Sequence, residues 1–107
     1  MFLESYKHKA AKKILADWLS ADYTVKLEAF FGKPVFSPDV TTLTEGQIDA
    51  FWEVEHKNGI DGKKLGKMQH YCYVNNLELY CYEVSAEWIL CQTEKPEQIV
   101  KFTYKLF

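Results

Sequence analysis

The sequence predicts a single α/β domain in which helices flank a mixed sheet of four to six strands. Amphipathic helical repeats occur in two places, near the N-terminus and in the middle of the chain. Short stretches rich in β-branched and aromatic residues lie between and after them. With 107 residues, 48% of them hydrophobic, residues 1–107 can build one core but not a second domain. The expected order is therefore helix, three strands, helix, strand, followed by a closing hairpin.

Residues 3–19 are expected to form the first helix. At about 100° per residue, one arc is apolar and contains Tyr6, Ala10, Ala11, Ile14, Leu15 and Trp18. The opposite side carries Lys9, Lys12 and Lys13. Glu4 falls on the bearing of Ala11 and Leu15, and an inward carboxylate is costly unless it is paired, hydrogen-bonded or linked to a metal. Glu4 could instead benefit from the helix dipole near the helix start.

Three strands are expected next. Residues 23–31 suit the first, Val35 and Phe36 open a second that carries Asp39, and residues 48–57 form the third. Because alternate residues of a strand share a face, one face of the third strand holds Phe51, Glu53, Glu55 and Lys57, and the other holds Trp52, Val54 and His56. Charges on a strand that helices should cover on both faces are unexpected, and they mark its far end as a candidate site.

The second half of the chain predicts a helix and further strands. Asp61 can cap a helix that runs to about Asn75, with an apolar stripe of Leu65, Met68 and Cys72 bordered by Gln69 and Tyr73. Residues 77–84 suit a fourth strand. Residues 88–92 and 100–106 suggest a closing hairpin around a turn at residues 94–97.

Composition narrows the class of protein. The formal net charge is −2, which argues against a non-specific nucleic-acid coat but leaves room for a local basic face. No apolar run approaches the ~20 residues of a membrane span, and no basic leader precedes a long apolar stretch, so we expect a cytoplasmic protein without a membrane partner. Cys72, Cys81 and Cys91 match neither a disulfide framework nor a zinc site and are interpreted as small apolar fillers.

Two short motifs in this order of elements resemble a known family. Pro38-Asp39 followed by Glu55-His56-Lys57 resembles the core of the PD-(D/E)xK nuclease superfamily, with its restriction-endonuclease-like fold (αβββαβ), over roughly residues 4–84. Gln69 and Tyr73 are similar to the Q-x-x-x-Y helix of its exonuclease-like branch. Glu4 resembles the extra acid that many members place on their first helix. Glu53, about 7 Å from Glu55 along the strand, departs from the motif and could assist or replace Glu55.

The resemblance implies Mg²⁺- or Mn²⁺-dependent hydrolysis of phosphodiester bonds, with DNA as the favoured substrate and RNA as the alternative. The carboxylates of Asp39 and Glu55 and the backbone carbonyl of His56 would hold the metal. Lys57 would orient or help to deprotonate the attacking water. Gln69 could position that water, and Glu4 could bind a metal-coordinated water. Phosphate contacts would come from the helix after the site, through Lys63, Lys64 and Lys67. A homodimer would supply a second site.

Plainer interpretations of the same residues remain open. Glu55 and Lys57 could form an exposed ion pair on an edge strand, Asp39 could be a turn residue, and the lysines could be a solvated face. Gln69 and Tyr73 could border the core. The alternative functions are a catalytically idle nuclease-like module that binds nucleic acid or a protein partner, and an unrelated α/β interaction protein.

Overall fold

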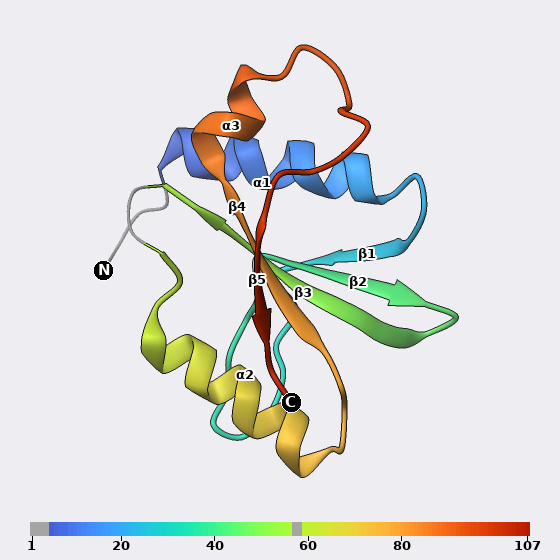
Figure 1. Ribbon diagram of the computed structural model, residues 1–107, viewed down its shortest axis with the longest axis vertical. Coiled ribbons are helices and arrows are strands. Elements are labelled where there is room, and N and C mark those ends of the chain that lie inside the picture. Colours follow the sequence, from blue (N-terminus) through green and yellow to red (C-terminus); the bar gives the residue numbers. More distant parts are fainter. Residues whose placement is uncertain (1–4, 57–58) are drawn as a thin grey trace.

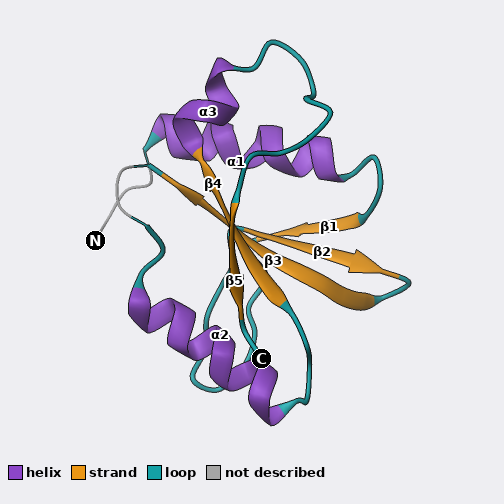
Figure 2. Cartoon of the chain, viewed as in Figure 1, coloured by secondary structure: helices purple, strands orange, loops and turns teal. Residues whose placement is uncertain are grey.

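The computed structural model describes residues 5–56 and 59–107, and this part of the chain forms a five-stranded sheet with helices on both faces (Figures 1 and 2). In chain order the elements are α1 (Tyr6–Leu19), β1 (Thr24–Leu27), β2 (Val40–Thr44), β3 (Gln47–Glu55), α2 (Gly62–Val74), β4 (Tyr80–Ser85), α3 (Ala86–Cys91) and β5 (Phe102–Lys105). The α/β class and the order helix, three strands, helix, strand are confirmed.

The sheet is mixed because of its one crossover. The strand order is β1-β2-β3-β4-β5, and β1, β2 and β3 form an antiparallel meander. β4 lies parallel to β3, since α2 carries the chain back across the sheet. β5 pairs antiparallel with β4 and forms the far edge. Figure 1 shows α1 and α3 on one face and α2 on the other.

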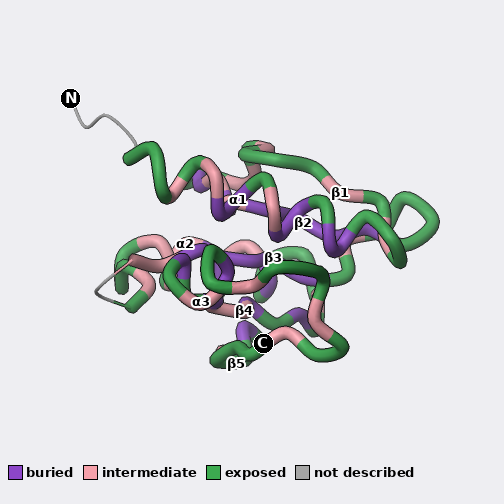
Figure 3. Tube along the Cα trace, turned by 90° about the horizontal axis from the view of Figure 1, so that it is seen from above, coloured by how far each residue is buried: buried purple, intermediate pink, exposed green. Residues whose placement is uncertain are grey.

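Alternation along β3 divides the core in two. Trp52 and Val54 pack with Leu15 of α1 and Ile89 of α3 on one face, whereas Phe51 packs with a cluster from α2 and β4 on the other. That second cluster includes Met68, Cys72, Leu79, Cys81 and Leu106. Figure 3 shows the buried stretches of β2 and β3 running through the middle of the molecule. The predicted faces of β3 are confirmed for residues 51–54, with Glu53 on the α2 side, and Lys57 falls outside the described residues.

The predicted apolar arc of α1 is wrong at two positions. Tyr6 is 88% exposed, while Lys12 is only 3% exposed. The buried face is centred on Lys12, Leu15 and Leu19, because α1 packs against α3 as well as against β1, β2 and β3. The Lys12 stem lies in this interface, and its ammonium reaches the acids Glu28 and Asp39.

The predicted closing hairpin is also wrong. Residues 88–92 lie mostly in α3, whose cap is Ser85: its hydroxyl accepts a hydrogen bond from the Trp88 backbone N–H at 3.2 Å. Ala86 and Ile89, one helical turn apart, are buried against the α1 side. β5 therefore pairs with β4. Cys91 is exposed at the end of α3 and is not an apolar filler, unlike the buried Cys72 and Cys81.

The strand expected from Val35 onward begins later. Phe31 and Phe36 pair only with each other, across a tight turn in which Gly32 has a φ of +73°. A Cβ on Gly32 would lie 3.1 Å from the Tyr71 ring, so glycine suits both the positive φ and the close approach of this turn to α2. Asp39 immediately precedes β2 rather than lying within it. Among the described residues, no helix is long and apolar enough to cross a membrane.

Candidate functional site

An open cavity of about 580 Å³ lies where β3 ends and β2 begins. The N-terminal parts of α1 and α2 form its walls, through His8 and Lys64. Its acidic lining comes from Asp39, Glu53 and Glu55 of the hairpin, and from Asp61 at the start of α2. The site therefore brings together residues from both helices and from the two strands of the central hairpin.

A shift in the β2–β3 register places Asp39 opposite Glu53. The hairpin starts with Thr44 paired to Gln47 and Leu43 paired to Ile48, but Thr42 pairs with Ala50, so one residue of β3 is extra. This β-bulge carries through to the pair Val40 and Trp52, which leaves Asp39 beside Glu53. Without the bulge Asp39 would oppose Trp52, on the wrong face of the sheet. Bulges are frequent next to active sites because they re-aim side chains.

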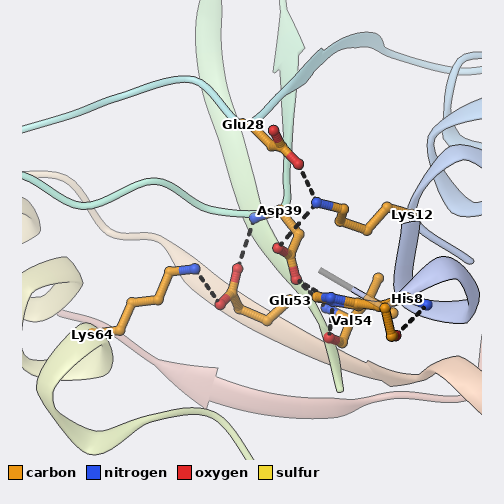
Figure 4. A network of polar contacts seen from close by, with 8 residues as sticks. His8, Lys12, Glu28, Asp39, Glu53, Val54 and Lys64 are labelled. Carbon is orange, nitrogen blue, oxygen red and sulfur yellow. Dashed lines mark hydrogen bonds and ion pairs between the residues drawn. The ribbon is translucent and has the colours of Figure 1, made fainter. Parts of the chain in front are cut away.

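Asp39 and Glu53 hold each other through the backbone, as Figure 4 shows. The Asp39 backbone N–H donates to Glu53 Oε2 at 2.7 Å. In return, the Val54 backbone N–H donates to Asp39 Oδ2 at 2.8 Å. These two hydrogen bonds fix both carboxylates at the open end of the β2–β3 hairpin, opposite its turn.

Lys64 compensates the charge of Glu53 from α2. Its Nζ lies 2.6 Å from Glu53 Oε1, and the Glu53 side chain is only 4% exposed whereas that of Lys64 is 25% exposed. Asp61 starts this helix by accepting a hydrogen bond from the Lys63 N–H, which puts Lys64 on the first turn facing the cavity. Lys64 is thus a residue of the cavity, in contrast to the exposed Lys63.

His8 and Lys12 approach the same cluster from α1 (Figure 4). His8 Nε2 lies 2.7 Å from the Val54 carbonyl oxygen and 3.4 Å from Asp39 Oδ2. Lys12 Nζ lies 4.0 Å from Asp39 Oδ1 and also pairs with Glu28. Sequence reasoning missed both residues, although they share one helical face with Leu15, at spacings of four and then three residues.

Burial and mutual repulsion make two acids of the site weak. Burial, and then the charge of Asp39, raise the pKa of Glu53 to about 7, against the opposing attraction of Lys64. The pKa of Glu55 also rises to about 7, first through burial and then through the charges of Glu53, Asp39 and Glu83. Either a proton or a cation would relieve this concentration of negative charge.

The donor chemistry of the cavity fits a hard divalent cation, since carboxylate oxygens are the ligands that Mg²⁺ and Mn²⁺ prefer. Within residues 5–56 and 59–107, no three His, Cys, Asp or Glu side chains are already arranged to hold a metal ion. Glu53 Oε1 faces Lys64 and Oε2 faces the Asp39 N–H. A cation entering the cavity would therefore have to replace Lys64 at Glu53, or bind through Asp39 and Glu55.

The predicted site residues are distributed unevenly around the cavity. Asp39, Glu55 and His56 all line it, and the His56 ring turns toward α3, where Nδ1 lies 3.0 Å from Glu87 Oε1. Gln69 and Tyr73 are exposed on α2 and do not line the cavity. Lys67 is half-buried on the same helix. The predicted roles of Glu4 and Lys57 fall outside the described residues.

Comparison with known protein families finds no matching family for this sequence, and comparison with curated proteins finds no match either. A function must therefore be inferred from the site itself.

Proposed function

We propose that this protein is a Mg²⁺- or Mn²⁺-dependent nuclease of the PD-(D/E)xK type, with a restriction-endonuclease-like fold, that hydrolyses phosphodiester bonds in DNA. One observation carries the proposal: Asp39, Glu53 and Glu55 converge on one open cavity at the ends of β2 and β3. The order of elements and the parallel pairing of β3 with β4 across α2 support it as well.

In this proposal the cation is held by Asp39, Glu55 and the backbone carbonyl of His56, with Glu53 assisting. A bound Mg²⁺ or Mn²⁺ supplies Lewis-acid activation of a water molecule and of the phosphate. The N–H of Val54 keeps Asp39 aimed at the cavity, and burial of Glu53 keeps its carboxylate beside Asp39. The protein therefore already holds two of the ligands in the orientation that cation binding requires.

Lysine side chains would supply the positive charge that the phosphate needs. Lys57 orients the attacking water in this scheme. Lys64, which pairs with Glu53, would be the group that could neutralise a non-bridging phosphate oxygen if Glu53 were to hold a cation instead. Lys63 and Lys67 contact the neighbouring phosphates. Glu4 keeps its proposed supporting role toward the water, but Gln69 does not line the cavity and is left out of this scheme.

The second candidate is an idle nuclease-like module that binds nucleic acid or a protein partner. A specific observation favours it: Glu53 uses both oxygens on protein groups, and Asp39 Oδ2 has the Val54 N–H and His8 close by. The cluster can therefore serve as an internal ionic clasp between α1, the hairpin and α2. In that case, removing a charge would change the folding stability, but it would not change the response to metal ions.

Metal-dependent cleavage distinguishes the two candidates. The nuclease should cleave DNA in Mg²⁺ or Mn²⁺, whether it is offered as a linear fragment or as supercoiled plasmid, and its melting temperature should rise with either ion. Asp39→Asn should abolish both effects, because the negative charge is lost. The local structure should remain, since the amide oxygen can still accept the Val54 N–H. Asp17→Asn, at an exposed position on α1, is the matched control and should keep both. Metal-independent DNA binding without cleavage would identify the idle module instead.

We also propose a homodimer. The edge formed by β4 and β5 carries exposed apolar side chains, among them Tyr80 (43%), Phe102 (73%) and Phe107 (39%). Sedimentation equilibrium should show a dimer that Phe102→Lys converts to a monomer. A wild-type chain that sediments as a monomer at tens of micromolar would contradict this part of the proposal.

A further inference from the structure

Lysines gather on the N-terminal halves of the two helices that border the cavity. The chain has 13 lysines and arginines, and all of them are lysines. α1 carries Lys7, Lys9, Lys12 and Lys13, and α2 carries Lys63, Lys64 and Lys67. More than half of the basic side chains thus belong to two helices of a chain whose net charge is −2.

Helix stability does not explain this placement. The macrodipole favours acids near a helix N-terminus and disfavours lysine there, by roughly 0.3–1 kcal/mol for each exposed charge. Neither α1 nor α2 has an acidic residue in its first turn. The lysines in the first turns, Lys7 and Lys9 of α1 and Lys63 and Lys64 of α2, are therefore unfavourably placed for the helix dipole, at the ends that border the cavity.

The lysines of α1 form a second basic surface beside the acids. Lys9, Lys12 and Lys13 line a depression of about 150 Å³ together with Leu27 and Glu28. Lys12, and more weakly Lys9, hold the pKa of Glu28 below its ordinary value. Lys12 also lies 4.0 Å from Asp39 Oδ1, so this depression adjoins the carboxylate cluster of the cavity.

The carboxylates consequently have lysines on both flanks. On the α1 side Lys12 approaches Asp39, and on the α2 side Lys64 approaches Glu53 (Figure 4). An anionic chain that reaches the carboxylates from one helix would meet a second set of ammonium groups as it leaves past the other. Lysine acts toward phosphate as a point charge without the bidentate geometry that reads guanine, so such contacts would not select a base sequence.

We propose that Lys9 and Lys13 of α1, together with Lys63 and Lys67 of α2, form one phosphate track, so that a nucleic-acid strand passes through the cavity rather than ending in it. This inference rests on the nuclease function proposed above and specifies its substrate as a continuous strand. Cleavage is then internal, and binding depends on the backbone and not on the base sequence.

The test is a pair of double charge reversals with the same change in net charge. Lys9→Glu/Lys13→Glu removes the α1 part of the track. Lys26→Glu/Lys33→Glu changes two exposed lysines that line neither the cavity nor the α1 depression and lie away from β4 and β5, and it is the matched control. Binding of a labelled 20-base-pair DNA duplex is followed by fluorescence anisotropy over a salt series, with Ca²⁺ in place of Mg²⁺ to keep the duplex intact.

The α1 variant should bind the duplex at least about tenfold more weakly than wild type, and its log K against log salt slope should be shallower by about 2, one unit for each lost phosphate contact. The control should lose much less affinity. If wild type, control and the α1 variant show the same order of affinities for duplex RNA, the proposed track binds both nucleic acids. The α1 variant should melt within a few degrees of wild type, because both lysines are exposed and Lys9 lies in the first turn of α1, where glutamate is favoured.

Equal affinities of the α1 variant and the control would overturn the track, since total charge would then explain binding. Cleavage of linear DNA without any nicking of a closed circle would overturn it as well. Neither result would contradict the proposed nuclease function. That function would be contradicted if Mg²⁺ and Mn²⁺ neither raised the melting temperature of the wild-type protein nor supported cleavage. Retention of the metal-induced thermal shift by the α1 variant would show that only strand binding was lost.

Discussion

Replacing Glu53 by glutamine should make the folding stability much less sensitive to pH. The pKa of Glu53 is raised from 4.5 in the unfolded chain to about 7 in the fold, mainly by burial. Because the raised pKa means that the folded protein prefers the protonated acid, the stabilising contribution is complete below pH 4.5 and is lost as the pH rises through about 7. Wild-type protein without metal should therefore be more stable at pH 5 than at pH 8.

The magnitude follows from the size of the shift. Each pKa unit corresponds to about 1.4 kcal/mol, so moving from 4.5 to about 7 makes Glu53 responsible for about 3 kcal/mol of lost stability between pH 4.5 and pH 8. No discount for solvent is needed because the side chain is only 4% exposed. Glu55 acts with the same sign but less strongly, since it is only half-buried.

The assay is urea unfolding in a chelating buffer at pH 5, 6.5 and 8, for wild type, Glu53→Gln and the control Glu78→Gln, which alters an exposed acid. The glutamine can still accept the Asp39 N–H, so the open end of the hairpin should stay intact. Glu53→Gln should keep only the smaller slope that Glu55 contributes, whereas Glu78→Gln should follow wild type.

A wild-type stability that rises from pH 5 to pH 8 would refute this account of the site. So would a Glu53→Gln variant with the full wild-type slope. Either result would mean that Glu53 is ionised in the fold as easily as in the unfolded chain, through a stronger hold by Lys64 than the structure indicates.

Three further outcomes are expected. The rise in melting temperature on adding Mn²⁺ should be larger at pH 8 than at pH 5.5, since the ion competes with the protons that Glu53 and Glu55 hold below about pH 7; a larger rise at pH 5.5 would count against carboxylate ligands. Of the three thiols, Cys91 alone should react rapidly with a disulfide reagent in the native protein, while all three react in urea. Ser85→Ala should cost about 1 kcal/mol of stability through loss of the α3 cap; an unchanged stability would argue against that cap.

The fold was largely predictable where one local signal decided the structure. Alternation along β3 assigned its two faces, and Asp61 marked the start of α2. α3 was not predictable in the same way, because Trp88 and Ile89 favour strands by propensity. There the Ser85 cap and the burial of Ala86 and Ile89 one turn apart outweigh that preference.

The site was predictable in its acids but not in their pairing. Asp39 and Glu55 lie in one cavity as expected, but Asp39 sits beside Glu53 because a bulge shifts the β2–β3 register, and strand periodicity does not reveal a bulge. Lys12 was assigned, with Lys9 and Lys13, to the side of the helix opposite the apolar arc. Its tertiary contacts with Asp39 and Glu28 compensate the buried charge.

The most direct test of the central claim is an NMR titration with Mn²⁺, whose paramagnetism broadens the signals of nearby amides. Sub-stoichiometric Mn²⁺ should first erase the backbone signals of Asp39, Glu53, Val54 and Glu55, followed by those at the start of α2, and Asp39→Asn should prevent this. Broadening that begins instead at acids remote from the cavity, such as Glu45 or Glu94, would show that the carboxylates of the hairpin do not form a cation site.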